Sequence, residues 1–571
     1  MNNSLSGKVI LITDSGTPIG RAASSLLTSR GAIVADGSPE STDYADPDAV
    51  RGLLERIAAK HGAVDGLFYN LVPAPVVRPV AALTEEDLNT LIDRDISAAF
   101  VTAQTYGEWC HAREDAAGHV RSFTGSAMCF LGSIHDEKPN GAAPLYSFYM
   151  GALQNMVREC ALYYGQWGVR TNLLEAGAMG GEDVLFESPV TNFYQGYAYK
   201  IPDGHVGTPE DIAEIAAFLL SGASRYVNGI GLRADGALTL HYMDAAANIR
   251  EYRRREAEGL PEAETKPLSF ASVIGDPDRR QAVLPGAMYL RGKNVLVTGS
   301  GKGIGSDIVL RAAEQGANVV VHYNSSEANA RQVYARVQAV TESTGARCTL
   351  IRGDLLSDGG AEALFRAAED FFAGRTGTDG TPVPAPASAA AEANSRPGID
   401  ILVNNAAMQL NLPFDRYDVT RLRRILRVNL RGYTMMSRLA LPHMCAQNWG
   451  RIVNISSVHS KRPTTFDPGY AMTKGGIRML TRELALEMVP YEITVNAIEP
   501  GAVEIGEKSG NPPSTITAKE LAYPPLFAYK RLANGLLDPS EISAAVLFFI
   551  SDAAARINGS CLRIDNGSML K

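Results

Sequence analysis

The sequence predicts two α/β domains in tandem, each built on a doubly wound parallel sheet. The chain has 571 residues, which is more than one hydrophobic core usually supports, so two domains and two cores are expected. Short β-branched runs such as VILIT, IVNIS and VLVTG alternate with segments of helical periodicity. That alternation is typical of βαβ units on a sheet that helices cover on both faces.

A long repeat relates the two halves of the chain. GKVILITDSGTPIG from Gly7 corresponds to GKNVLVTGSGKGIG from Gly292, and GVRTNLLEAGA from Gly168 corresponds to YEITVNAIEPGA from Tyr491. Near the ends, TPEDIAEIAAFLLSGASRYVNGIGLRADG corresponds to DPSEISAAVLFFISDAAARINGSCLRIDNG. Each half is therefore expected to be one copy of the same fold.

Composition sets the boundaries between these copies. Charge runs and prolines in REYRRREAEGLPEAETKP predict an exposed linker, so the domains are expected at residues 1–245 and 288–571, with the linker at 246–287. A Pro/Ala/Gly-rich stretch at about residues 373–398 predicts a mobile surface insertion in the second domain.

Charge and cysteine usage exclude several classes of protein. Apolar residues make up 45% and charged residues 20%, which is ordinary for a globular chain, and a net charge of −8 argues against a nucleic-acid binder. The six cysteines lack CxxC spacing, so reduced thiols in the cytoplasm are expected rather than disulfides or a metal site. Neither a signal peptide nor a membrane span is expected.

A glycine-rich loop, TGSGKGIG at residues 298–305, follows the expected strand NVLV and precedes an expected helix. This is the setting of a dinucleotide-binding loop, in which glycines let the backbone approach the pyrophosphate. The helix N-terminus supplies N–H groups and the positive end of its dipole. Taken alone, such a loop is a weak signal.

Further motifs follow the loop in order along the C-terminal half. They are Asp354, NNAA at residues 404–407, Asn429 in VNLRG, Ser457 in NISSV, Tyr470 and Lys474 in YAMTK, and PG at Pro500. With this set the C-terminal half resembles the short-chain dehydrogenase/reductase family over essentially its whole length. The resemblance implies a Rossmann-type fold and oxidoreductase activity, and it is strongest to 3-oxoacyl-thioester reductases and sugar dehydrogenases.

The resemblance implies catalytic roles for Tyr470, Lys474, Ser457 and Asn429, and physical chemistry supports the first two. In a helix these two stand at i and i+4, so the ammonium is expected beside the phenol, where it would lower a pKa that is normally about 10. Tyr470 would then exchange a proton with a substrate oxygen, which Ser457 would also contact. Asn429 would help to anchor Lys474 and a proton-relay water.

The resemblance also implies a set of cofactor-binding residues. They are Gly299, Lys302, Gly303, Ile304, Gly305, Asn324, Ser325, Asp354, Leu355, Asn405, Ala406, Tyr470, Lys474, Pro500, Gly501 and Val503. NAD would need an acidic residue about 20 positions after the glycine loop, but VVVHYNSS from Val319 ends without a carboxylate. Lys302 is either an exposed lysine without a ligand or the partner of a 2′-phosphate. We expect NADP(H), with Asp354 at the adenine amino group.

The segment from Ala502 to about residue 536 is expected to cover the substrate. Its Tyr523, Phe527 and Tyr529 would either contact an apolar substrate or only pack the lid. Ile505 stands where the family usually has a threonine, so one expected contact to the nicotinamide is in doubt. A small carbonyl or alcohol substrate is expected.

The N-terminal copy departs from the pattern at several of the same landmarks. It keeps Ser133 and Tyr146 at the spacing of Ser457 and Tyr470. The replacements are Met150 for Lys474, Asp95 for Asn429, Ala176 for Pro500, Asp14 for Gly299, and Tyr69 and Asn70 for the asparagine pair at 404–405. Its segment VADGSPESTDYADPD is too short for the usual crossover helix, so half of the adenosine pocket is expected to be absent.

These differences predict one NADP(H) per chain and chemistry only in the C-terminal half. Members of the family commonly pair through the helix that carries the YxxxK motif, so the N-terminal copy is expected to act as a built-in partner in an intramolecular pseudo-dimer, within a homo-oligomer. Two alternatives stay open: a sugar or polyol dehydrogenase, and a nucleotide-binding scaffold without turnover. A divergent ligand site in the first copy also stays open.

Overall fold

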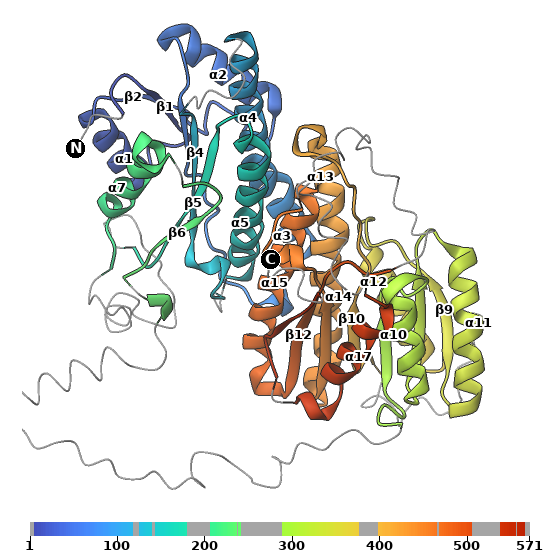
Figure 1. Ribbon diagram of the computed structural model, residues 1–571. Helices are drawn as coiled ribbons and strands as arrows, with labels where there is room; N and C mark the ends of the chain where they lie inside the picture. Colours follow the sequence, from blue (N-terminus) through green and yellow to red (C-terminus); the bar gives the residue numbers. More distant parts are fainter. Residues whose placement is uncertain are drawn as a thin grey trace, which may run out of the picture.

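The computed structural model confirms two parallel sheets, one in each half of the chain. It describes residues 5–117, 125–139, 143–179, 206–225, 227–236, 238–240, 288–375, 398–464, 467–504, 537–555 and 557–565. Both sheets are parallel throughout and helices alternate with their strands (Figure 1). The predicted linker at 246–287, most of the insertion at 373–398, Ile505 and the three aromatic residues of the substrate segment, Tyr523, Phe527 and Tyr529, lie outside the described residues.

The N-terminal half forms a six-stranded sheet of order β2-β1-β3-β4-β5-β6. Its strands are β1 (Val9–Ile12), β2 (Ile33–Asp36), β3 (Gly66–Tyr69), β4 (Ala127–Ser133), β5 (Arg170–Ala176) and β6 (Gly231–Ala234). Its helices are α1 (Pro18–Ser29), α2 (Pro47–His61), α3 (Glu85–Thr90), α4 (Ser97–Ala117), α5 (Pro144–Gly165) and α7 (Pro209–Leu220), with a π-helical segment η2 (Leu91–Ile96).

The C-terminal half forms a seven-stranded sheet of order β13-β12-β11-β10-β7-β8-β9. Its strands are β7 (Asn294–Val297), β8 (Asn318–Tyr323), β9 (Cys348–Arg352), β10 (Ile401–Asn404), β11 (Gly450–Ile455), β12 (Ile493–Pro500) and β13 (Cys561–Ile564). Its helices are α10 (Gly303–Glu314), α11 (Glu327–Thr344), α12 (Gly360–Phe372), α13 (Val419–Leu426), α14 (Gly432–Ala446), α15 (Pro468–Met488) and α17 (Pro539–Ile550), with a π-helical segment η8 (Arg427–Arg431) and a short 3-10 helix η9 (Val458–Ser460).

The two sheets differ by one helix and one edge strand. In the C-terminal half β8 leads through α11 to β9 and then through α12 to β10, whereas in the N-terminal half β2 leads through α2 directly to β3. The short VADGSPESTDYADPD segment explains the difference, because it leaves no chain for that extra unit. Within residues 5–117 the N-terminal sheet therefore has no counterpart of β9.

Local sequence explains where the paired helices begin. Thr208 and Asp538 precede Pro209 and Pro539, and each forms a capping box with an acidic residue three positions later. Proline is favoured in the first turn because its missing N–H has no intrahelical partner there. The repeat in the sequence therefore becomes a repeat in structure, with α7 and α17 beginning in the same way.

Helices of the two halves pack directly against each other between the sheets. Helix α5 contacts α15 along its length (Figure 1), and a Cβ atom at Gly475 would lie 2.2 Å from the carbonyl oxygen of Gly151. Buried Asn155 donates hydrogen bonds to the carbonyl oxygens of Ser460 and Ala471, both at 2.9 Å. The backbones approach this closely only because both crossing residues are glycines.

The expectation of two separate cores is wrong in one respect. Each half has an apolar cluster on the outer face of its sheet, but the inner clusters merge into one core that spans both halves. Phe100 of α4 stacks on Phe414 with ring centroids 4.6 Å apart. The merger follows from the helix packing, since α4 and α5 bury their apolar residues against α13–α15 rather than leaving them at a surface.

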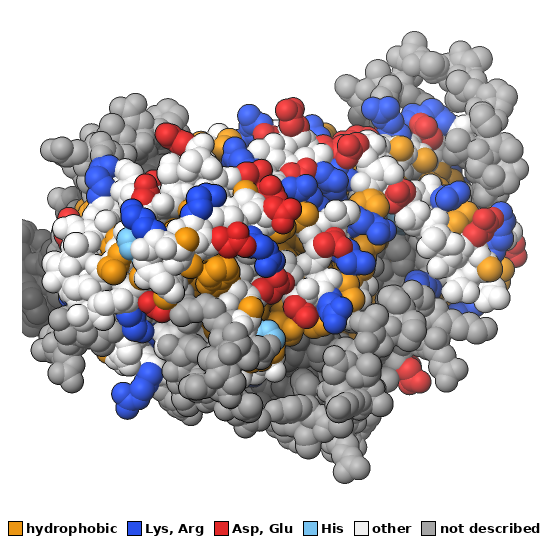
Figure 2. All heavy atoms as spheres, turned by 90° about the horizontal axis from the view of Figure 1, so that it is seen from above, with side chains coloured by type: hydrophobic (Ala, Val, Ile, Leu, Met, Phe, Trp, Pro, Cys, Tyr) orange, Lys and Arg blue, Asp and Glu red, His pale blue; other side chains and the backbone are white. Residues whose placement is uncertain are grey.

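Surface charge does not gather into a single-sign region on the face shown in Figure 2, where acidic and basic side chains are interspersed. No helix in the described ranges is both long and apolar enough to cross a bilayer. Across those same ranges, no cluster of His, Cys, Asp and Glu side chains is arranged to hold a metal ion.

Candidate active site and cofactor site

The predicted site residues of the C-terminal half gather at the carboxyl edge of its sheet. Gly299 follows β7, Asn324 and Ser325 follow β8, Asp354 and Leu355 follow β9, Asn405 and Ala406 follow β10, Ser457 follows β11, and Pro500 ends β12 with Gly501 and Val503 beyond it. Adjacent β7 and β10 lead away in opposite directions across the sheet. In doubly wound sheets such a point is where ligands bind.

The catalytic helix α15 begins at a buried carboxylate. Asp467 is fully buried, accepts a hydrogen bond from the backbone N–H of Tyr470 at 3.2 Å, and also accepts the backbone N–H groups of Leu410 and Asn411 at 2.8 and 3.0 Å. The Tyr417 hydroxyl donates a fourth bond at 2.5 Å. Asp467 thus fixes the start of the helix and ties it to the segment that follows β10.

Ser457, Tyr470 and Lys474 meet as the sequence predicts. The Tyr470 side chain is hydrogen-bonded to Ser457. Lys474 is buried, its Nζ atom lies 5.1 Å from the Tyr470 ring centroid, and it donates a hydrogen bond of 2.8 Å to the carbonyl oxygen of Ile455. The ammonium is thus held beside the phenol by the end of β11.

The expected lowering of the Tyr470 pKa by Lys474 is wrong for the chain by itself. Burial raises the pKa of Tyr470 to about 12, although the hydrogen bond with Ser457 by itself lowers this pKa. Burial also lowers the pKa of Lys474 to about 7. The physical reason is that burial removes water from both charged forms, which favours the neutral phenol and the neutral amine. At neutral pH Tyr470 therefore keeps its proton.

Asn429 lies within η8, and its hydrogen bonds differ from the expected contact to Lys474. Its Oδ1 accepts the backbone N–H of Met408 at 2.7 Å, and its Nδ2 donates to the Met408 carbonyl at 2.9 Å and to the Thr473 hydroxyl at 3.1 Å. It therefore reaches α15 through the neighbour of Lys474, not through Lys474. The π-helical turn, a feature frequent at functional sites, turns its side chain to this segment.

The glycine loop between β7 and α10 has the backbone form that a phosphate cradle needs. Gly299 and Gly303 have φ values of 68° and 61°, and a Cβ atom at Gly299 would lie 2.8 Å from Cα of Ala406. The Thr298 hydroxyl accepts the N–H groups of Asn405 and Ala406 at 2.9 and 3.1 Å. The side chain of exposed Lys302, the N-cap residue of α10, does not cap the first turn, which contains Ile304 and Gly305. These features fit a dinucleotide.

The expected adenosine side of the site is a connected pair of polar residues. Asn324 donates to Asp354 at 3.0 Å, and Asp354 also accepts the backbone N–H of Leu356 at 3.0 Å and the Ser357 hydroxyl at 2.7 Å. Leu355 beside them is buried and Ser325 is exposed. Asp354 therefore shapes the turn that leads from β9 toward α12.

His322 is a residue of this site that sequence reasoning missed. Its Nδ1 accepts the backbone N–H of Gly299 at 2.8 Å, and its Nε2 lies 3.2 Å from the Gly353 carbonyl oxygen. Burial lowers the pKa of His322 to about 4, so the ring is neutral, with its proton on Nε2. His322 thus ties the glycine loop to the end of β9. In the sequence, His322 could have been noticed as a histidine that directly follows three valines of an expected strand.

The N-terminal copy keeps the packing of the catalytic helix without its cation. Tyr146 is hydrogen-bonded to Ser133, and burial raises its pKa to about 12, as for Tyr470. Met150 is buried at the place of the lysine. Asp95, at the place of Asn429, pairs instead with Arg94 at 2.7 Å.

The glycine loop of the N-terminal copy is occupied by its own side chains. Asp14 accepts the backbone N–H of Gly16 at 2.8 Å, and Asn70 accepts the N–H of Asp14 at 2.9 Å. The Asp36 carboxylate accepts the N–H of Ser15 at 3.3 Å. What distinguishes this loop from the one at Gly299 is therefore its two carboxylates, which lie where a phosphate would approach and would repel it.

Tyr44 fills the space after β2 in the same copy. Its ring is buried and its hydroxyl donates to the Gly37 carbonyl oxygen at 2.9 Å. The ring meets Tyr69 edge-on at 6.4 Å between centroids. Two tyrosines thus pack against each other between the segment after β2 and the end of β3.

Comparison with known proteins gives a family for both halves. The family described as enoyl-(acyl carrier protein) reductase matches residues 6–239 and 385–569, and the family described as short chain dehydrogenase matches residues 293–375. 3beta-hydroxysteroid dehydrogenase 1 of Eggerthella lenta is 33% identical over 286 residues, which cover 49% of this chain and 95% of that protein.

Two further relatives carry other substrates in their names. Glucose 1-dehydrogenase 2 of Bacillus subtilis is 29% identical over 49% of this chain and 96% of its own length. 3-oxoacyl-(acyl-carrier-protein) reductase FabG of Aquifex aeolicus is 30% identical over 49% of this chain and 98% of its own length. The chain is an oxidoreductase of the short-chain dehydrogenase/reductase family, with two copies of the family's fold in tandem.

Proposed function

We propose that the chain is an NADP-dependent carbonyl reductase whose chemistry takes place only in the C-terminal half. The observation that carries this proposal is the contrast between Tyr470 and Tyr146. Both tyrosines are hydrogen-bonded to a serine, but only Tyr470 has a lysine beside it, in the half whose glycine loop leads into a helix that its N-cap side chain, Lys302, leaves uncapped.

The residues of the site have distinct roles in this reaction. The bound nicotinamide supplies the hydride. Tyr470 keeps its proton at neutral pH because burial raises its pKa, so it is suited to donate that proton to the carbonyl oxygen as negative charge develops there. Ser457 orients the same oxygen. Lys474 is held at the end of β11, where its protonated form would stabilise the phenolate left behind.

A 3-oxoacyl thioester or a similar ketone is the substrate class we propose. Similarity to a 3-oxoacyl-(acyl-carrier-protein) reductase supports it. The second candidate is a sugar or polyol, which similarity to a glucose 1-dehydrogenase favours.

The preference for NADP rests on the charge around the ribose end. Neither Asn324 nor Ser325, which follow β8, is acidic, so the chain position at which NAD-binding proteins carry a carboxylate for the ribose holds none. Lys302 is exposed and is the residue from which α10 starts. A cation there can form a charge-assisted bond to phosphate.

One cofactor per chain follows from the closed loop of the N-terminal copy. The Asp14 and Asp36 carboxylates accept backbone N–H groups of that loop, and the buried Tyr44 ring packs after β2. A dinucleotide would have to displace two carboxylates and place its phosphates beside them. We therefore assign no nucleotide to this copy.

We propose that the N-terminal copy serves as an intramolecular partner. The α5–α15 crossing, with glycines at its centre, and the shared core support a pseudo-dimer of domains at residues 1–245 and 288–571, joined by a linker at 246–287. The assembly state that we propose for the whole protein is a homo-oligomer. The six cysteines, all of which lie within the described residues, form no disulfide there, which favours a reducing compartment that we take to be the cytoplasm.

Matched tyrosine variants test the proposed function. NADPH oxidation by wild type, Tyr470→Phe and Tyr146→Phe is followed with 3-oxoacyl thioesters, polycyclic ketones and sugars. Tyr470→Phe is expected to lower kcat by about 10²-fold to 10⁴-fold with little change in NADPH affinity, because only proton transfer is lost. Tyr146→Phe is expected to keep wild-type turnover. Equal losses in both variants would refute the assignment, and NADPH binding without turnover of any substrate would favour the scaffold alternative.

A further inference from the structure

Two rows of charged and polar side chains, one row from each half, face each other beside the cofactor site, and we call them the ladder. One side is formed by α3 and η2 of the N-terminal half, and the other by α13 and η8 of the C-terminal half. Residues on each side recur at intervals of four and so share one helical face. They are Glu85, Asn89 and Asp93 on the first side and Arg423, Arg427 and Arg431 on the second.

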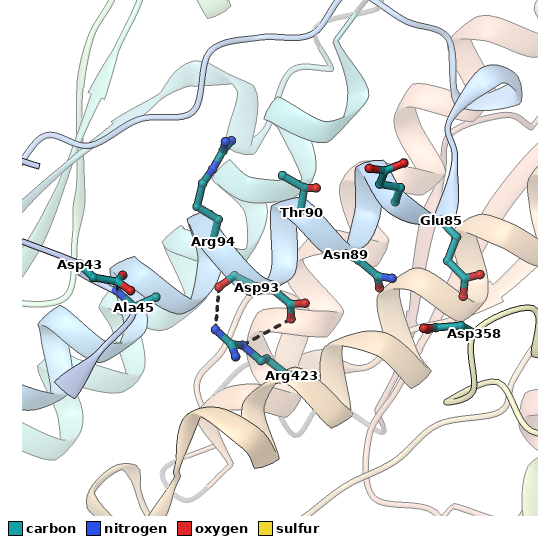
Figure 3. A pocket seen from close by; sticks show the side chains of 10 residues that line it. Asp43, Ala45, Glu85, Asn89, Thr90, Asp93, Arg94, Asp358 and Arg423 are labelled. Atoms are coloured by element: carbon teal, nitrogen blue, oxygen red, sulfur yellow. Dashed lines mark hydrogen bonds and ion pairs between the residues drawn. The ribbon is translucent and has the colours of Figure 1, made fainter. Parts of the chain in front are cut away.

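At the end of the ladder farther from the segment after β9, the contacts join only η2 to α13 and η8. Asp93 pairs with Arg427 at 2.6 Å and with Arg423 at 3.3 Å, and Arg423 also donates to the Asp93 carbonyl oxygen at 2.8 Å. Figure 3 shows Arg423 reaching Asp93 across a hollow between the halves. None of these contacts involves the segment after β9.

The other end of the ladder is centred on Arg431 and reaches that segment. The Arg431 side chain is 1% exposed. One terminal nitrogen contacts Glu85 and Asn89 of the N-terminal half, both at 2.9 Å, and Asp358 at 2.7 Å. The other nitrogen donates to the Leu356 carbonyl oxygen at 2.6 Å. A single buried guanidinium therefore links α3 to the backbone of the segment at 354–359.

Glu85 also forms a direct hydrogen bond to the same segment. Its other oxygen accepts the backbone N–H of Gly359 at 2.9 Å. Gly359 is the N-cap of α12, has a φ of 70°, and has no side chain of its own to cap the helix. The carboxylate of the N-terminal half therefore supplies the negative charge that a helix N-terminus favours. Figure 3 shows Glu85 and Asn89 on one face of α3, on the side of Asp358.

We propose that α3 of the N-terminal half positions the adenine-binding segment of the C-terminal half through Arg431 and Gly359. This inference rests on the proposed function, since Asp354 at the start of the segment is an adenine contact only if NADP(H) binds here. Asp354 is fixed from one side by Asn324. The contacts of Glu85 and Arg431 fix the far end of the same turn.

The contact to a β9-type segment exists on one side only. With Asn429 matched to Asp95, the residue of the N-terminal copy that corresponds to Arg431 is Ser97, whose hydroxyl donates to the carbonyl oxygen of Ile92 and accepts a hydrogen bond of 3.3 Å from Arg423. Among the residues that the structure describes, the N-terminal copy has no counterpart of β9 that Ser97 could hold. The positioning of a segment after β9 is therefore a contribution of the N-terminal half to the C-terminal half.

The test compares two ends of the same ladder in the full-length chain. Glu85→Ala and Asn89→Ala remove contacts to Arg431 and its segment, and Asp93→Ala is the matched control because it removes interdomain ion pairs that do not touch residues 354–359. The readouts are the NADPH Kd by titration calorimetry, amide hydrogen exchange at 354–359, and kcat at saturating NADPH.

The expected result is a split between the two ends. Glu85→Ala is expected to raise the NADPH Kd about fivefold or more, the lower range of coupling between sites, and to speed exchange at 354–359 while leaving kcat near the wild-type value. Asn89→Ala is expected to act in the same direction, and Asp93→Ala is expected to leave Kd within about twofold.

Two results would overturn the inference. In one, Glu85→Ala and Asn89→Ala leave both Kd and exchange at 354–359 unchanged. In the other, Asp93→Ala raises Kd as much as Glu85→Ala, which would make the effect a general loosening of the interface. A wild-type chain that binds no NADPH would instead refute the proposed function, and the exchange data would still decide whether α3 orders the segment.

Discussion

The crossing of α5 and α15 leaves no room for a side chain at Gly475, and this predicts the effect of Gly475→Ala. The new Cβ atom would lie 2.2 Å from the Gly151 carbonyl oxygen and 2.6 Å from Nδ2 of Asn155, well inside the 3.4 Å at which ordinary contact begins. The helices would have to separate by roughly 1 Å, and overpacking of this kind costs about 1 to 3 kcal/mol.

Two further terms set the size of the effect. Separation of the helices would stretch the buried bonds from Asn155 to Ser460 and Ala471, both 2.9 Å long, and each is worth about 1 kcal/mol. Alanine returns about 1 kcal/mol because it favours a helix more than glycine does. The free energy of unfolding is therefore expected to fall by about 2 to 4 kcal/mol, which lowers Tm by several degrees.

The assay is differential scanning calorimetry of Gly475→Ala beside a glycine-to-alanine control. Gly52 in α2 is the control, because a Cβ atom there meets only the end of the flexible Arg56 side chain, at 3.4 Å. Gly52→Ala is expected to leave the free energy of unfolding unchanged or to raise it by up to about 1 kcal/mol, so that Tm stays the same or rises slightly. A Gly475→Ala chain that is as stable as the Gly52→Ala chain would refute the close helix crossing.

Three other predictions concern the cofactor, the buried lysine and the isolated half. Lys302→Ala should weaken NADPH by about tenfold or more relative to NADH, because a charge-assisted contact of about 1.5 to 3 kcal/mol is lost; an unchanged NADPH/NADH affinity ratio in binding titrations would place the discriminator elsewhere. Burial lowers the pKa of Lys474 to about 7. From about pH 7 to pH 10 the unfolded chain therefore binds more protons than the folded chain, so the free energy of unfolding of the wild type should rise with pH across that window. Lys474→Met, which copies Met150, should therefore abolish turnover yet raise Tm at about pH 6, with the difference shrinking toward pH 10; a Tm below wild type at both pH values would contradict this. Residues 285–571 expressed alone should self-associate in analytical ultracentrifugation, because α15 would lose its cover; a monomeric and fully active fragment would show that the first half is dispensable.

Patterns that repeat within a segment made the fold predictable. The buried strand NVLV, the glycines after it and the capping prolines act over a few residues, so a single sequence contains them. The short segment after β2 also predicted that a crossover helix is missing from the N-terminal half, whereas the loss of the strand that pairs with β8 in the other half was seen only in the structure. The tyrosine, serine and lysine of the site were found because their order along the chain is itself a signal.

Features that depend on packing across the halves were not predictable in this way. Asn89 and Arg431 are 342 positions apart, and nothing local marks them as partners. The direction of the Tyr470 pKa shift was also beyond the sequence, because it depends on how completely the phenol and the Lys474 ammonium are buried, not on their spacing. Likewise, His322 needed the three-dimensional approach of the glycine loop to β9.

The most direct test of the central claim is the stoichiometry of NADPH binding to the full-length chain, measured by titration calorimetry. The account predicts one site per chain, because the loop at Gly299 fits a dinucleotide while the loop at Asp14 is filled by its own carboxylates. It also predicts that Lys302→Ala weakens that single site. Two sites per chain, or one site that Lys302→Ala and Glu85→Ala both leave unchanged, would contradict the assignment of the chemistry to the C-terminal half.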